Sequence, residues 1–110
     1  MRKRSADLDE ALRVMAPRLP GRDRAAVVDR ALGSRQMHHA PAPVAAHAAL
    51  VAYARHGFTD YDALLREGYG RDEARFFVAD RLRAVLSGWG CRNLAGLGTE
   101  QPLTPVYPSL

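Results

Sequence analysis

Residues 44–56 read VAAHAALVAYARH, and this stretch decides the fold of the 110-residue chain. It consists almost entirely of alanine, valine, leucine and tyrosine. A helix that is apolar on every side is normally the buried, central helix of its domain. Gly57 follows as the expected end of the helix. No segment alternates apolar and polar residues as a half-buried strand would, so we expect an all-α fold built around residues 44–56.

Two amphipathic helices are expected before the central one. The first begins at a cap, either Ser5 or Asp7, and ends at Pro17, because proline disfavours helical geometry in the residue before it. The second runs from about residue 23 to residue 32, and Gly33 ends it. Its expected inward residues are Ala25, Val28 and Leu32. The loop that follows, residues 34–43, has two prolines and no apolar period.

Two further helices are expected after the central one. Thr59 is a natural N-cap for a short helix that ends at Gly68, and Asp62 can complete a capping box. The last helix runs from Arg71 to about Ser87. Its expected apolar face is made of Ala74, Phe77, Val78, Leu82, Val85 and Trp89. The prediction is a compact bundle of about five helices, with two N-terminal, one central and buried, one short and one long C-terminal.

The length of the chain suits one domain. We assign residues 6–92 to a single helical domain, residues 1–5 to a basic N-terminal arm, and residues 93–110 to an irregular tail that is flexible or laid on a surface. No apolar run is long enough to span a membrane, and no signal peptide pattern is visible, so we expect a cytoplasmic protein without a membrane partner. Cys91 is the single cysteine, which excludes an intramolecular disulfide.

The net charge of +4 comes from the N-terminal third of the chain. Residues 1–35 hold nine Lys or Arg and five Asp or Glu, and the remaining residues are almost balanced. The run Arg2, Lys3 and Arg4 fits either a solvated tail or an arm that contacts phosphate backbones.

Three arginines fall on apolar sides of their helices. At 100° per residue, Arg55 points to the apolar side of the central helix, and Arg71 and Arg75 bracket the apolar face of the last helix. Buried guanidinium groups must be paired. The sequence therefore predicts a polar cluster that joins three helices.

Two interpretations of this cluster remain open. In the structural one, Asp60 and Asp62 cap their helix and pair with the three arginines. In the functional one, some arginines collect an anion, such as a phosphate or a partner's carboxylate, in a groove. The expected lining of that groove is His56, Tyr61 and Tyr69.

No catalytic, metal or cofactor pattern is present. The chain has none of the glycine-rich phosphate loops, no G-x-S-x-G motif and no cysteine–histidine nucleophile pattern. The histidines are not spaced for a metal site, which needs three or four convergent ligands. These histidines are His38, His39, His47 and His56. We expect a non-catalytic protein without a cofactor.

The second half of the chain resembles a known family. Its features are Arg55-His56, a Thr-x-Tyr-Asp sequence at residues 59–62, a leucine pair, Gly68, an Arg-x-x-Ala-Arg sequence at residues 71–75 and Trp89. In these features it is similar to an uncharacterised bacterial and fungal family catalogued as domain of unknown function 2293. The likeness covers roughly residues 8–92 and implies no activity, substrate or cofactor.

Two functions of different classes follow. The first is a binding module for nucleic acid or another anionic partner, such as an acidic protein surface, which predicts a positive surface that unites the arm with further arginines. Those arginines are Arg22, Arg24, Arg30 and Arg35. The second is a protein-interaction module, for example a homodimer, that uses an exposed apolar face of the last helix with Phe76 and the proline-rich tail.

Overall fold

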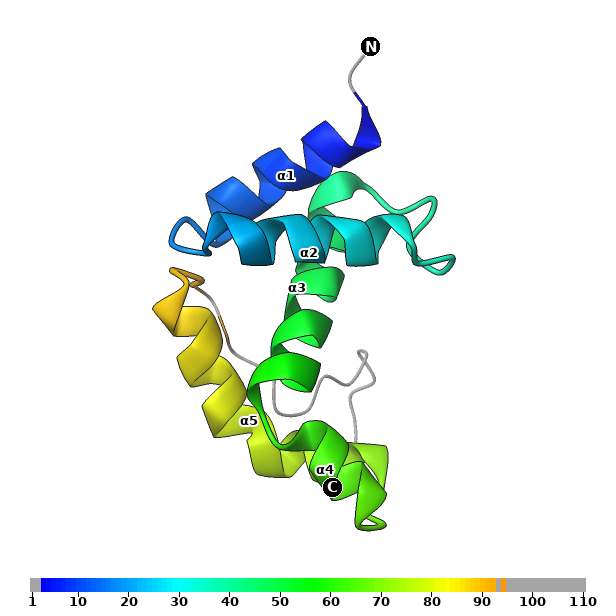
Figure 1. Cartoon of the computed structure of the whole chain (residues 1–110), viewed down its shortest axis with the longest axis vertical. Helices are drawn as coiled ribbons and strands as arrows, with labels where there is room; N and C mark the ends of the chain where they lie inside the picture. The colour runs from blue at the N-terminus through cyan, green and yellow to red at the C-terminus, as the bar shows by residue number, and fades with distance from the viewer. Residues whose placement is uncertain (1–2, 93, 95–110) are drawn as a thin grey trace, which may run out of the picture.

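The computed structural model describes residues 3–92 and residue 94. Five α-helices account for most of this part of the chain, and no strand occurs in it (Figure 1). They are α1 (Arg4–Met15), α2 (Gly21–Leu32), α3 (Ala42–Phe58), α4 (Tyr61–Arg66) and α5 (Arg71–Gly88). The expected all-α bundle of about five helices is confirmed. None of these helices has the length and apolar character needed to cross a bilayer.

Helix α3 is the centre of the molecule. It packs against α1 and α2 at one end of the molecule and against α4 and α5 toward the other, so it carries most of the helix–helix contacts (Figure 1). Its buried face consists mainly of alanine, with Leu50 as its largest apolar side chain. The opposite side is exposed at Val44, His47 and Ala48, so the expected burial on every side is wrong. Alanine and valine are small and apolar at exposed positions too, and their apolar character alone does not identify a covered side.

The main core joins four of the helices. Its large, fully buried side chains come from α1, α2, α3 and α5, and they are Leu8, Leu12, Val27, Leu50, Leu82 and Leu86. A smaller cluster joins α4 to α5 through Tyr61, Ala74 and Val78. The described chain therefore has one main core, with a satellite around α4.

Several helix ends differ from the expected ones. Helix α1 begins at Arg4, so both cap candidates, Ser5 and Asp7, lie inside it, as do two of the five residues assigned to the arm. Helix α3 continues through Gly57 to Phe58, because Gly57 has no positive φ. Helix α2 buries Val27, Val28 and Ala31 and leaves the expected inward residues Ala25 and Leu32 exposed. The assigned tail, apart from Leu94, lies outside the described residues.

Glycines end α4 and α5 in the same way. Gly68 and Gly90 both have positive φ, at 102° and 93°. Each follows its helix in a Schellman arrangement, in which the next amide donates to a carbonyl five residues earlier, Tyr69 to Leu64 and Cys91 to Leu86. Only glycine adopts this left-handed backbone without strain.

The link between α1 and α2 is fastened to the end of α5. The backbone amide of Arg18 donates to the Trp89 carbonyl at 2.9 Å, and its guanidinium donates to the Ser87 and Gly88 carbonyls at 3.1 and 3.2 Å. These carbonyls belong to the last turn of α5, where intrahelical donors are missing. Arg18 therefore satisfies the end of α5 and holds it against the first two helices.

Polar contacts also join α1, α2 and α3. Arg24 of α2 donates to Asp9 of α1 at 2.8 Å, and Asp9 accepts a second bond of 2.8 Å from Arg13. The bond from Arg13 and the bond from Arg24 hold the pKa of Asp9 below its ordinary value, against the opposing effect of burial. The hydroxyl of Tyr53 on α3 donates to Asp23 of α2, and this bond, together with burial, raises the pKa of Tyr53.

Candidate functional site

Arg55 lies inside the protein, as its position on the helical wheel predicts. Its side chain is 6% exposed, and its guanidinium carbon is 5.5 Å from the ring centroid of Tyr61, a cation–π distance. Tyr61 is buried at the start of α4, and the edge of the His56 ring packs against it at 5.3 Å. The structure therefore stacks Arg55, Tyr61 and His56 where α3 meets α4.

Asp62 pairs with histidine rather than with arginine. Its Oδ1 atom is 2.6 Å from Nδ1 of His56, and both side chains are more than a third exposed. The N-cap of α4 is Asp60, which makes no side-chain cap bond, so the expected N-cap Thr59 lies one residue too early. Thr59 Oγ1 nevertheless accepts from the Tyr61 amide at 3.2 Å, and Asp62 pairs with His56 instead of completing a capping box.

The predicted clasp of aspartates and arginines is not assembled. Neither Asp60 nor Asp62 pairs with Arg55, Arg71 or Arg75 among residues 3–92. Asp60 and Arg71 are exposed, which corrects the expected inward direction of Arg71, whereas Arg75 is half-buried. Arg71 is the first residue of α5. Its side chain lies toward the apolar face of the helix by the 100° repeat, but it is exposed at this helix end.

The expected groove is divided between two places. Tyr61 belongs to the small core between α4 and α5, and His56 lies against it at the surface. Tyr69 is part of a different surface, where its ring contacts the edge of Phe77 at 5.4 Å. Among the described residues, the ring contacts of Tyr69 therefore differ from those shared by His56 and Tyr61.

The His56–Asp62 pair resembles an oriented base, but within residues 3–92 no nucleophile is seen beside it. The hydroxyl nearest in sequence, that of Thr59, donates to the Arg55 carbonyl at 2.6 Å and accepts from the Tyr61 amide. This hydroxyl is held by the backbone and is not aimed at the histidine. In the described part of the chain, no three His, Cys, Asp or Glu side chains lie close enough together to hold a metal.

A second group of polar residues is predicted only in part from the sequence. From Arg30 to Thr59 the chain contains no aspartate or glutamate. This gap spans the boundary at residue 35, so the charge of residues 1–35 alone does not reveal it. Exposed basic residues of this segment lie at the end of α2 and in the loop after it, close to the start of α1. We define the basic surface as Lys3, Arg30, Arg35, His38 and His39, all of which are exposed.

One hydrogen bond joins the two parts of this surface. Arg4, the first residue of α1, donates to the Met37 carbonyl at 2.9 Å, which brings the start of α1 to the loop that carries Arg35 and the two histidines. Arg24, expected in the same surface, is bound to Asp9 instead. Arg22 is exposed near the opposite end of α2, eight residues before Arg30.

Two of the exposed large apolar residues are adjacent on α5. Phe76 and Phe77 are 70% and 57% exposed, and their ring centroids are 5.9 Å apart. With Tyr69 they form what we call the aromatic face, which contradicts the expected inward direction of Phe77. Adjacent large aromatic residues exposed in this way are uncommon on a monomer surface.

Comparison with known proteins assigns the chain to a family without adding an activity. No curated protein and no solved structure matches the sequence. The family described as uncharacterized conserved protein (DUF2293) matches residues 11–90, which is well over half of the chain. The matched segment includes the last five residues of α1, all of α2 to α5 and the glycine that follows α5. On this match, the chain belongs to the DUF2293 family of uncharacterized conserved proteins.

Proposed function

We propose that this domain is a non-catalytic module that binds the phosphate backbone of nucleic acid through its basic surface. The observation that carries the proposal is the absence of any acidic residue from position 30 to position 59, together with the exposure of Arg30 and Arg35 within that segment. Phosphate contacts by lysine and arginine supply most of sequence-independent binding to nucleic acid. The proposal assumes a cytoplasmic location.

The surroundings of the basic surface support an anionic partner. Arg30, Arg35 and Lys3 form no ion pair within residues 3–92, so binding a phosphate breaks no internal pair. The bond between Arg4 and the Met37 carbonyl keeps the two parts of the surface together. By contrast, the segment around α4 and the start of α5 mixes acids with arginines, and we expect it to contribute little.

The test is the salt dependence of binding. We expect weak binding to both single- and double-stranded oligonucleotides at low salt, measured by fluorescence anisotropy, with log K falling linearly as log salt concentration rises. The double variant Arg30→Gln/Arg35→Gln should reduce the magnitude of that slope by about two, because each lost phosphate contact removes about 0.9 from it.

The matched control removes the same charge elsewhere. Arg66 and Arg71 are exposed at the other end of the molecule, and the variant Arg66→Gln/Arg71→Gln should keep nearly the original slope. An equal loss in both double variants would show that net charge, and not the basic surface, governs binding. If no DNA or RNA binds the unaltered chain at low salt, the proposal is wrong.

A second candidate function is self-association through the aromatic face. Besides the exposed rings, α5 carries Asp72 before Phe76 and Arg83 after it. In an antiparallel pair of α5 helices related by a twofold axis, Asp72 of one copy lies opposite Arg83 of the other. Burial of the rings would drive association, and these charges would favour the antiparallel orientation.

Sedimentation velocity distinguishes this second candidate. We expect a concentration-dependent dimer that the variant Phe76→Ser/Phe77→Ser converts to monomer. Val14→Ser removes an apolar side chain that is equally exposed on α1 and should leave the dimer intact. A chain that stays monomeric at high concentration excludes the dimer.

A further inference from the structure

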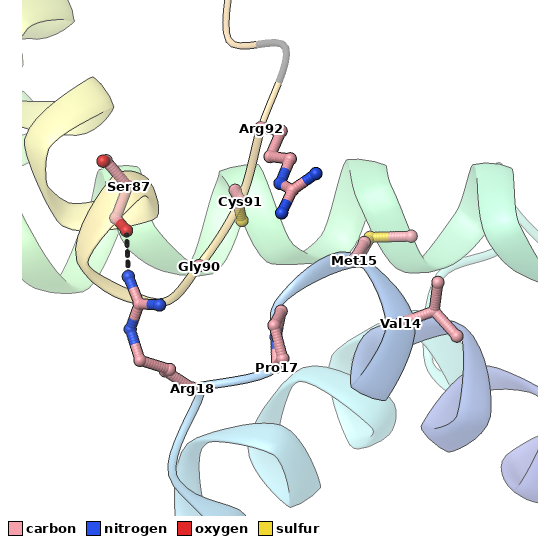
Figure 2. Close-up of a pocket in the computed structure, with 8 residues that line it drawn as sticks. All are labelled: Val14, Met15, Pro17, Arg18, Ser87, Gly90, Cys91 and Arg92. Atoms are coloured by element: carbon pink, nitrogen blue, oxygen red, sulfur yellow. Dashed lines mark hydrogen bonds between the residues drawn. The ribbon is translucent and has the colours of Figure 1, made fainter.

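A pocket separate from both surfaces lies where the α1–α2 link meets the end of α5 (Figure 2). Its volume is about 490 Å³, within the range of small-molecule sites. The polar lining comes from Arg18, Ser87, Cys91 and Arg92, and no acidic residue lines the pocket. Two guanidinium groups without a carboxylate among the lining residues give the pocket a net positive charge.

The two arginines are held differently. Arg18 is fixed, because it donates to the Ser87 carbonyl (Figure 2) and to the Gly88 carbonyl. Those bonds offset the negative end of the α5 dipole, which would otherwise disfavour an anion here. Arg92 is exposed and has no ion pair within the described residues, so its donors are available to a ligand. Figure 2 shows Cys91 between the two guanidinium groups.

The rest of the lining is apolar. Val14, Met15 and Pro17 form the wall that α1 and its link contribute. Such a wall favours a ligand with a hydrocarbon body over a bare ion. Ser87 contributes its backbone carbonyl, which accepts from Arg18.

Cys91 lines the pocket without making it reactive. Burial raises the pKa of its thiol, so the sulfur stays protonated and neutral at neutral pH. A neutral thiol does not repel an anion and is a poor nucleophile. The arrangement therefore suits binding rather than covalent chemistry.

From this geometry we infer that the pocket binds a small organic oxyanion, a carboxylate or a phosphate monoester, between Arg18 and Arg92. Guanidinium groups match the planar, two-oxygen edge of these groups, and the wall from α1 receives the apolar body. This site differs from the basic surface in position and in ligand, and it does not depend on nucleic-acid binding.

The experiment uses the full chain and four probes, which are phenyl phosphate, benzoate, inorganic phosphate and neutral benzyl alcohol. In ¹H–¹⁵N NMR titrations, phenyl phosphate and benzoate should shift the amides of Arg18, Gly90, Cys91 and Arg92. Arg92→Gln should weaken their binding about tenfold, since a hydrogen bond to a charged group is lost. Arg22→Gln changes the net charge equally at an exposed site outside the pocket and should bind as the unaltered chain does.

Cys91 gives a second readout because it is the only cysteine. Phenyl phosphate should slow its alkylation by neutral iodoacetamide in proportion to occupancy, followed by mass spectrometry. Equal weakening in Arg92→Gln and Arg22→Gln would overturn the site, as would benzyl alcohol binding as tightly as the two anions. If inorganic phosphate binds as tightly as phenyl phosphate, the claim that the pocket selects a ligand with an apolar body is wrong.

Discussion

Gly90→Ala is expected to lower the free energy of unfolding by about 3 kcal/mol and the melting temperature by about 15 °C. Two costs add at this position. The backbone of Gly90 has a φ of 93°, which an alanine adopts only with strain. A Cβ atom there would also lie 2.9 Å from Cδ and Cγ of Pro17, closer than real Cβ contacts. Thermal and urea denaturation measure the loss.

The close contact between a Cβ at position 90 and Pro17 cannot be relieved by rotating a flexible side chain. The proline ring is part of the α1–α2 link, and its backbone nitrogen lies 3.4 Å from the same Cβ position, so relief requires the link to move. That movement would stretch the bond from the Arg18 amide to the Trp89 carbonyl, which fastens the link to α5. The added methyl group therefore acts on the junction of three helices.

Two other glycines separate the strain from the clash. Gly68 has a φ of 102° and no atom within 4 Å of its Cβ position, so Gly68→Ala should show the backbone strain alone, about 1 kcal/mol. Gly88 lies in α5 with open space around it, and Gly88→Ala should be neutral or slightly stabilising. If Gly90→Ala costs no more than Gly68→Ala, the approach to Pro17 does not constrain the fold.

The sequence predicts the helices better than the faces they bury. Apolar periodicity, apolar composition and capping residues together predict all five helices. Leu32 and Phe77 are assigned to the core by periodicity, yet both are exposed. Periodicity records that a side chain is apolar, and it does not record whether another helix lies opposite. The exposed residues on α5 are therefore invisible as a surface until the positions of the helices are known.

The polar cluster shows the same limit. Arg55 is buried, as expected, but Val44 and Ala48 lie on the same side of α3 at 100° per residue and are exposed. The burial of Arg55 therefore depends on the turn into α4, which places Tyr61 against it. The partner of Asp62 depends on the turn between α3 and α4, and the turn brings His56 to the carboxylate. The pocket between Arg18 and Arg92 is formed by residues 14–18 and 87–92, which are far apart in the sequence. No pattern within a short stretch of sequence predicts that they meet.

Leu50→Ala should be the most damaging core substitution on α3, with a loss of about 3 to 4 kcal/mol in the free energy of unfolding. Leu50 is fully buried, and the other buried apolar residues of α3 are four alanines and Val51. Small buried residues let α1 and α2 approach α3 closely, which leaves these helices little room to move nearer. They cannot close further over a deleted side chain, and a cavity remains. Urea denaturation with an unchanged m-value measures the effect.

Val44 provides the comparison within the same helix. Its side chain is 54% exposed, so Val44→Ala should change the stability by less than about 0.5 kcal/mol. The two substitutions put the same residue into the same helix and differ chiefly in what surrounds the side chain. Similar losses in both would mean that helix propensity, and not packing against α3, holds the domain together. A large loss at Leu50 alone would identify α3 as the element on which the other helices depend, because a native domain has only about 5 to 15 kcal/mol to lose.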